Sequence, residues 1–117
     1  MGFNVEFYRT SDDKCIIEDF LDFLDSKVAQ KVTCVLSLIE DLERVPIKYF
    51  KKLTGSDGIW EVRVETHIGF IRIFGFIAGQ NLWLTHGIIK KTDKTSKTDI
   101  NKAEQYKKDY SERNQLI

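Results

Sequence analysis

Apolar residues recur with two different spacings along residues 1–45. Residues 3–8 alternate between apolar and polar or amphipathic side chains, which predicts a strand. In residues 14–24, and again in 26–45, apolar residues fall at the i, i+3, i+4, i+7 spacing of a helix face. The second pattern ends at Val45-Pro46, because proline disfavours helix at the residue before it. We therefore expect a strand followed by two adjacent helices that form a hairpin.

The centre of the chain changes to strand-like patterns after a predicted loop at 46–58. Three runs follow, at 59–66, 70–78 and 82–89, and their short connections predict an antiparallel meander. The tail returns to helical spacing after Ser96, a residue typical of a helix start. The order β-α-α-β-β-β-α predicts an α+β domain, in which the helical hairpin covers one face of a small sheet and the first strand joins the sheet's edge.

The composition predicts one compact domain over residues 1–117. Hydrophobic residues make up 42% of the chain, and 2 Trp, 4 Tyr and 8 Phe can fill a core. Cys15 and Cys34 are too few for a disulfide framework, and both lie in apolar helical patterns that predict buried thiols in a reducing compartment. The sequence shows no signal peptide and no bilayer-spanning apolar run. We therefore expect a cytoplasmic protein that does not act at a membrane.

The balanced charge of 18 basic and 18 acidic residues hides a split between the two parts of the chain. Residues 1–45 carry ten acidic and five basic side chains, so the helical hairpin looks unsuited to contact with phosphate. Residues 46–117 carry eight acidic and thirteen basic side chains. The basic residues on or beside the predicted strands are candidates for an anion site: Lys51, Lys52, Arg63, Arg72, His86, Lys90, Lys91 and Lys94. The alternative for the run 90–94 is a solvated connection with no binding role.

Arg72 is the most informative single residue because it interrupts an otherwise apolar central run. A buried guanidinium requires a partner, so Arg72 either forms a salt bridge with Glu61 or Glu65, or faces an exposed concavity. A two-residue turn between the first two meander strands would place Arg63 opposite Arg72. A three-residue loop ending at Gly69 would separate the two arginines.

Two opposed arginines would repel each other, and a phosphate between them would make that arrangement tolerable. Guanidinium groups suit a phosphodiester both before cleavage and in its more highly charged transition state. His86, on a strand with Leu82, Leu84 and Ile88, is predicted to share their face, so it is either a hydrogen-bonded core residue or a proton-transfer group. A lysine with a lowered pKa could also transfer the proton.

Four sequence blocks resemble the HigB-like branch of the RelE/ParE toxin superfamily. They are FYRT…IEDFLDFL at 7–24, YFKKLTG-SDGIWEVRV at 49–64, FIRIFGF at 70–76 and LWLTHGIIKKTDKT at 82–95. The resemblance implies a small RelE-like α+β toxin, bacterial or phage-borne and encoded beside an antitoxin. Its implied activity is ribosome-dependent cleavage of messenger RNA, which inhibits translation and arrests growth. The implied mechanism is attack by the RNA's 2′-hydroxyl, with neither a metal nor an organic cofactor.

The resemblance also implies residue roles and partners. Arg63 and Arg72 match positions that bind phosphate and stabilise the transition state, while His86 belongs to the branch's motif. The candidate catalytic residues are Arg63, Arg72, His86, Lys90 and Lys91, and the candidate RNA-binding residues are Lys51, Lys52 and Lys94. The implied partners are a HigA-like helix-turn-helix antitoxin, the ribosome and messenger RNA, with operator DNA reached only through the antitoxin.

Two other functions remain open from the sequence. Some RelE-type nucleases carry an aromatic residue or histidine after the last strand, and this chain has none there, so its general acid and base are not identified. The chain could therefore be a non-catalytic ParE-like toxin that binds and inhibits DNA gyrase. A third interpretation is an inert or chaperone-like domain whose charges only keep it soluble.

Overall fold

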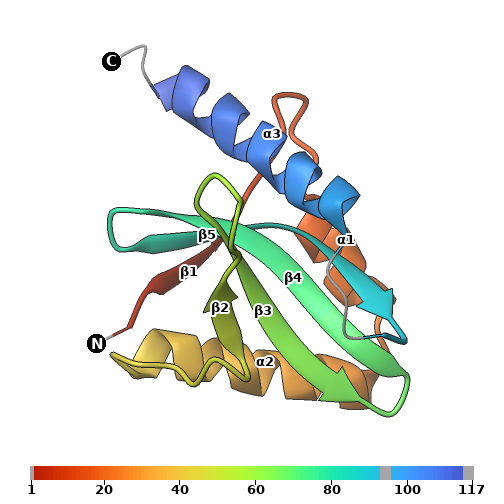
Figure 1. The fold of residues 1–117 in the computed structure, drawn as a ribbon. Coiled ribbons are helices and arrows are strands. Elements are labelled where there is room, and N and C mark those ends of the chain that lie inside the picture. The colour runs from red at the N-terminus through yellow and green to blue at the C-terminus, as the bar shows by residue number, and fades with distance from the viewer. Residues whose placement is uncertain (1, 93–95, 115–117) are drawn as a thin grey trace.

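Five strands form one mixed sheet, with three helices on its two faces (Figure 1). These counts refer to residues 2–92 and 96–114, which the computed structural model describes. The elements are β1 (Asn4–Phe7), α1 (Ile16–Phe23), α2 (Ser26–Asp41), β2 (Phe50–Lys52), β3 (Ile59–Thr66), β4 (Gly69–Ala78), β5 (Asn81–Lys90) and α3 (Lys97–Asn114). In these described ranges, no helix has the length and apolar character needed to cross a bilayer.

The strand order β1-β5-β4-β3-β2 confirms the predicted meander and extends it at both edges. Strands β3, β4 and β5 are antiparallel neighbours, and β1 joins the edge parallel to β5. At the other edge β2 pairs antiparallel with β3, so the prediction of loop throughout 46–58 is wrong at residues 50–52. A strand of three residues is too short for alternation to reveal it.

The turn between β3 and β4 contains two residues, because Thr66 pairs directly with Gly69. The hydroxyl of Thr66 donates to the carbonyl of Gly69 at 2.8 Å, and accepts from the amide of Ile68 at 3.3 Å. Gly69 has a φ of 129°, a conformation that favours glycine. This register settles the open question of the turn by placing Arg63 directly opposite Arg72.

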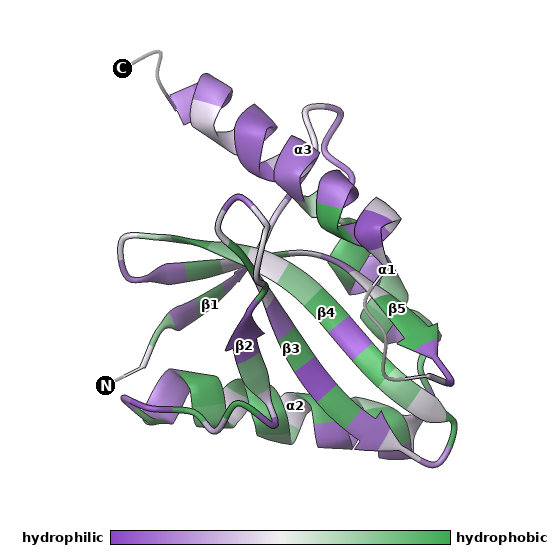
Figure 2. Cartoon of the chain, viewed as in Figure 1, coloured by the Kyte–Doolittle hydropathy of each residue, from purple (hydrophilic) through white to green (hydrophobic). Residues whose placement is uncertain are grey.

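Two apolar cores lie on opposite faces of the sheet. Helices α1 and α2 cover one face, where Ile17, Val32 and Ile39 pack with residues of β3, β4 and β5. Helix α3 covers part of the other face through a stripe of Ile100, Ala103, Tyr106 and Tyr110. Figure 2 shows the resulting pattern, with hydrophobic residues along β4 and a largely hydrophilic α3. The expectation of a helical hairpin on one face is confirmed.

A β-bulge in β5 reverses the expected orientation of His86. The register shifts between Phe74, which pairs with His86, and the next residue of β4, which pairs with Leu84. Thr85 is thus the extra residue, and its hydroxyl donates to the carbonyl of Phe74 at 3.1 Å. The prediction that His86 shares a face with Leu82 and Leu84 is wrong, because both leucines lie in the hairpin core, whereas His86 faces α3.

The helical hairpin differs from its prediction at two points. Helix α2 begins at Ser26, directly after Asp25, whose carboxylate accepts a hydrogen bond from the amide of Val28 at 3.0 Å, but the helix ends at Asp41 rather than at residue 45. Cys15 is buried as expected, whereas Cys34 is exposed. The buried residues of α2, including Val32, face the sheet, and Cys34 lies on the helix surface away from that core.

Candidate functional site

Three charged side chains form a compact cluster on the α3 side of the sheet. Glu61 and Arg63 are two residues apart on β3, so they share a face, and Arg72 joins them from β4. Nη1 of Arg72 donates to Oε1 of Glu61 at 2.7 Å. Nε of Arg63 lies 3.3 Å from the same oxygen. Of the two partners predicted for Arg72, the structure therefore selects Glu61, whereas Glu65 is exposed and lies opposite Phe70.

The cluster explains how two arginines can face each other inside the fold. Arg72 and Glu61 are each 1% exposed, and Glu61 places a carboxylate against both guanidinium groups. The protein itself thus supplies an anion at the position where the sequence suggested a phosphate. The three side chains together still carry a formal charge of +1. The Arg63 side chain is 24% exposed, so it is the arginine that a ligand can reach more readily.

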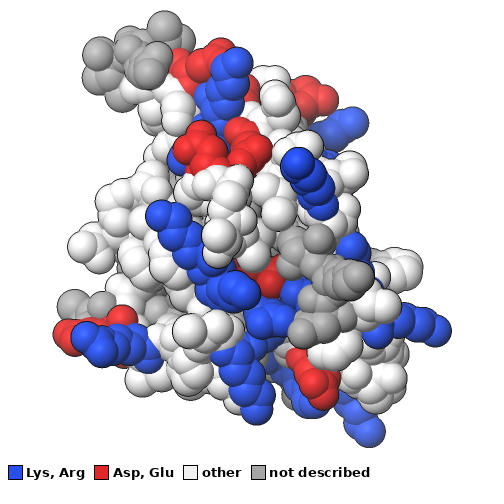
Figure 3. Space-filling view, in the orientation of Figure 1, with Lys and Arg blue, Asp and Glu red and all other residues white. Residues whose placement is uncertain are grey.

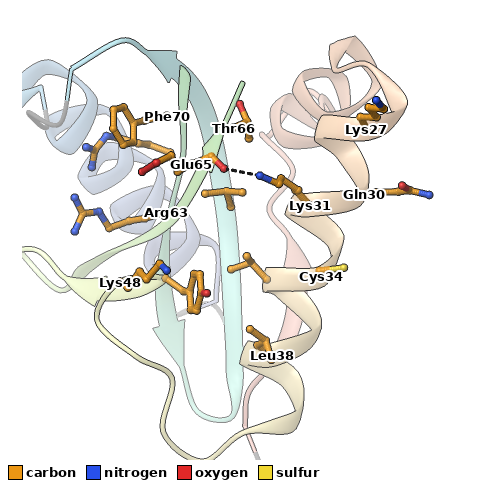
Figure 4. Close-up of a pocket in the computed structure, with 14 residues that line it drawn as sticks. Lys27, Gln30, Lys31, Cys34, Leu38, Lys48, Arg63, Glu65, Thr66 and Phe70 are labelled. Atoms are coloured by element: carbon orange, nitrogen blue, oxygen red, sulfur yellow. Dashed lines mark hydrogen bonds between the residues drawn. The ribbon is translucent and has the colours of Figure 1, made fainter. Parts of the chain in front are cut away.

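A groove with a volume of about 830 Å³ runs along the edge of β3 beside α2. Figure 4 shows Arg63, Lys48 and Phe70 on one side of it and Lys27 and Lys31, from α2, on the other. Figure 3 shows Lys and Arg side chains gathered below α3 on the face in view. The apolar part of the lining comes from Val35, Leu38, Tyr49, Val64 and Phe70. The arginine cluster therefore opens onto a basic groove with apolar walls.

The predicted lysines divide between the two faces of the sheet. Lys51 pairs with Glu61 and lies on the arginine face, whereas Lys52 pairs with Trp60 and lies on the opposite face. Lys90 pairs with Phe70 at the end of β5, again on the arginine face. Lys91 is exposed just after that strand. Lys94 lies outside the described residues.

His86 is placed under α3 rather than in the groove. Its side chain is 2% exposed, and its ring stacks on Phe74 with centroids 4.9 Å apart. Its Nε2 lies 3.5 Å from Oδ1 of Asp99, at the start of α3. Burial lowers the pKa of His86 to about 4, and Lys102 acts in the same direction while Asp99 opposes it. His86 is therefore neutral at pH 7 and covered in this structure, which leaves its predicted catalytic role a prediction.

The sequence did not indicate the three lysines from outside the meander that line the groove. Lys27 and Lys31 are one helical turn apart on α2, within the part of the chain whose acidic balance argued against phosphate contact. Lys48 comes from the connection before β2. The i, i+4 spacing of the helix lysines is a signal, but only the tertiary structure shows that they face Arg63. Within the described ranges, no group of three or more His, Cys, Asp or Glu could hold a metal ion.

Comparison with known proteins places this chain in a family. No curated protein is a significant match to the sequence. The family model described as Phage derived protein Gp49-like (DUF891) matches residues 19–108. The matched part runs from α1 into α3 and includes Glu61, Arg63 and Arg72. The chain therefore belongs to the Gp49-like phage-derived family, a RelE-like family related to toxin–antitoxin systems, which implies an antitoxin partner.

Proposed function

We propose that this protein is the toxin of a HigB-like toxin–antitoxin pair and that it cleaves messenger RNA on the ribosome. The observation that carries the proposal is the Arg63–Glu61–Arg72 cluster at the mouth of a basic groove. A phosphodiester gains negative charge as the 2′-hydroxyl attacks it, so a preorganised guanidinium lowers the barrier. Membership of a RelE-like family supports the same activity.

The two arginines have different roles in this proposal. Arg63 contacts the scissile phosphate, because its side chain is partly exposed and lines the groove. Arg72 is a positioning residue, since it is buried and acts through Glu61, which holds the Nε edge of Arg63. A fixed Arg63 needs less free energy to reorganise during the reaction than a mobile side chain would need.

Proton transfer is assigned to groups that border the arginine cluster. Lys90 lies on the same sheet face at the end of β5, and Lys91 follows it. The ammonium group of either lysine could protonate the departing 5′-oxygen, and the neutral amine of the other could take the proton of the attacking 2′-hydroxyl. Lys51, which faces Glu61 from β2, contacts the RNA backbone. His86 would join them only after α3 moved away from it.

The test compares wild type with Arg63→Ala and with Arg44→Ala, an exposed arginine between α2 and β2. Each variant is induced in cells, its folding is checked by circular dichroism, and the ends of messenger RNA are mapped with and without ribosomes. We expect ribosome-dependent cleavage by wild type and Arg44→Ala, and a loss of about 100-fold or more for Arg63→Ala.

Two results would contradict the nuclease proposal. Growth arrest with intact messages, and with inhibited supercoiling by DNA gyrase, would favour the non-catalytic ParE-like toxin. Equal cleavage by wild type and folded Arg63→Ala would show that Arg63 does not stabilise the transition state.

A further inference from the structure

Helix α3 is held to the sheet by a thin apolar contact. Within Lys97–Asn114 one residue, Ala103, is fully buried, and the helix is otherwise largely hydrophilic (Figure 2). Ile100, Tyr106 and Tyr110 pack against the same face of the sheet but are only partly buried. Polar contacts along the helix therefore decide how firmly each part of it is held.

The middle and the second half of α3 are fastened by hydrogen bonds. Asp109 accepts a hydrogen bond from the hydroxyl of the buried Tyr8, and it also forms an ion pair with Arg113 at 2.9 Å. One turn and more before it, Oε2 of Glu104 accepts from the backbone amide of Asp57 at 2.7 Å. These contacts join the helix to the segment after β1 and to the loop before β3.

The first half of α3 meets β5 in a different way. Oδ1 of Asp99 lies 3.5 Å from Nε2 of His86, which is beyond the usual hydrogen-bond length of about 2.7–3.2 Å. Nε2 is buried, and no group in the described part of the chain forms a hydrogen bond with it. A buried polar atom without a partner costs free energy, so the contact at His86 favours the closed position less than the hydrogen bonds further along the helix do.

His86 itself is held from the side of the sheet. Its ring stacks on Phe74 of β4 with centroids 4.9 Å apart. Its Nδ1 lies 3.1 Å from Oγ1 of Thr85, which is buried in β5. Because these contacts come from the strands, the imidazole keeps its place when the helix above it moves.

The covered histidine borders the arginine cluster. His86 pairs with Phe74, and Ile88, two residues further on β5, pairs with Arg72. His86 and Arg72 are therefore diagonal neighbours on the same face of the sheet, a relation in which residues lie about 7–8 Å apart. The beginning of α3 thus covers a titratable group directly beside the site.

We propose that the first half of α3, residues 97–103, is a lid that detaches from the sheet while the second half stays fastened. Segments with few buried apolar contacts open locally at a lower free energy than the whole fold does. Opening uncovers Nε2 of His86 beside the arginine cluster, and the closed lid excludes RNA from this nitrogen. The consequence for cleavage rests on the proposed nuclease function, whereas the opening itself does not.

Acylation by diethyl pyrocarbonate, which attacks neutral imidazole, tests the lid without RNA. The chain has two histidines, and the tryptic peptides 64–72 and 73–90 carry one each, so mass spectrometry follows them separately. The side chain of His67 is 63% exposed and serves as the reference for an open histidine. We expect His86 to react more slowly than His67. Its rate should rise less steeply with urea than global unfolding does, because a local opening exposes less surface.

Two variants separate the halves of the helix. Ile100→Ala weakens the packing of the lid, so it should accelerate acylation of His86 about tenfold and leave His67 unchanged. Tyr8→Phe is the matched control, because it removes the hydrogen bond to Asp109 in the second half. It should change the rate at His86 by less than about twofold.

Three results would overturn the lid. Acylation of His86 as fast as that of His67 would show that α3 does not cover it. Acylation of wild type only at the rate and with the urea dependence of global unfolding would exclude a separate opening, and this comparison holds even if Ile100→Ala does not fold. Equal acceleration by the two variants would show that α3 moves as one unit. Cleavage is not measured here, so the lid and the nuclease activity can fail independently.

Discussion

Arg63 and Arg72 lie directly opposite each other across β3 and β4, and one carboxylate oxygen of Glu61 contacts both. The two cations differ in environment, because Arg72 is 1% exposed whereas the Arg63 side chain is 24% exposed and borders the groove. Glu61 thus joins a buried structural cation to one that a ligand can reach. The buried and the accessible arginine can therefore be tested separately by mutation.

Glu61→Gln should destabilise the fold strongly. The amide can still accept a hydrogen bond from Arg72, but it leaves two closely placed guanidinium groups without their shared anion. Removing one member of a buried ion pair typically costs about 3–5 kcal/mol of unfolding free energy, and Arg63's partial exposure places the expected loss near ~3 kcal/mol. Urea denaturation measures this loss. Glu65→Gln, an exposed change on the same strand face, should alter stability by less than about 0.5 kcal/mol. Equal effects of the two variants would contradict the anchoring role of Glu61.

His86 should make the protein lose stability in mild acid. Burial lowers the pKa of His86 from 6.5 to about 4. Between these two pH values the unfolded chain therefore binds a proton at His86 more readily than the folded chain does. The stabilisation is complete above pH 6.5 and is lost as the pH falls from 6.5 toward 4. Between pH 7.5 and pH 5 we expect a loss of about 2 kcal/mol in unfolding free energy.

The control for this pH dependence is His86→Phe, which keeps an aromatic ring against Phe74. Urea denaturation of both proteins at the two pH values isolates the contribution of His86 to the pH dependence. His67 and the carboxyl groups are present in both proteins, so their contributions cancel in the comparison. The loss in wild type should exceed the loss in the variant by about 2 kcal/mol. Identical losses would show that His86 is protonated as readily in the folded protein as in the unfolded chain.

Tyr8 should hold α3 against the rest of the fold. Its side chain is buried and its hydroxyl donates to Asp109, while Arg113 donates to the backbone carbonyl of Arg9 at 2.6 Å. Tyr8→Phe leaves the apolar contacts but removes the hydroxyl, so we expect a loss of about 1–2 kcal/mol in unfolding free energy. Burial, with the hydrogen bond to Asp109, also raises the pKa of Tyr8 to about 12. An alkaline absorbance titration should therefore show a tyrosine ionising near pH 12 in wild type that is missing in Tyr8→Phe. Unchanged stability would mean that apolar contacts alone hold α3.

Local patterns in the sequence predicted the main elements because alternation and helical spacing extend over several residues. The helical hairpin, the meander and the packing stripe of α3 follow from such patterns. The opposition of Arg63 and Arg72 depended on a single turn, and the sequence left both turn lengths open. The bulge at Thr85 reversed the face of His86, because one extra residue in a strand moves every later side chain to the opposite face of the sheet. The apolar and polar residues of the strand do not show where such a bulge lies.

The groove could not be predicted because its two sides come from distant parts of the chain. Lys31 and Glu65 are joined by a hydrogen bond although 34 positions separate them. The acidic balance of the hairpin hid the fact that its lysines lie on the side facing β3. A sum of charges over a segment contains no information on which face carries them, and that distribution appears only when α2 is packed against the sheet.

Lys51→Ala and Lys52→Ala should have different effects although the two residues are adjacent. Lys51 faces Glu61 on the arginine side of the sheet, whereas Lys52 faces Trp60 on the other side. If RNA lies over the arginine cluster, removing Lys51 should weaken RNA binding and reduce the slope of log K against log salt by about one phosphate contact. Lys52→Ala should leave both quantities close to those of wild type. The measurement is fluorescence anisotropy of a labelled single-stranded RNA at several salt concentrations, and equal losses in the two variants would show that RNA does not follow the arginine face.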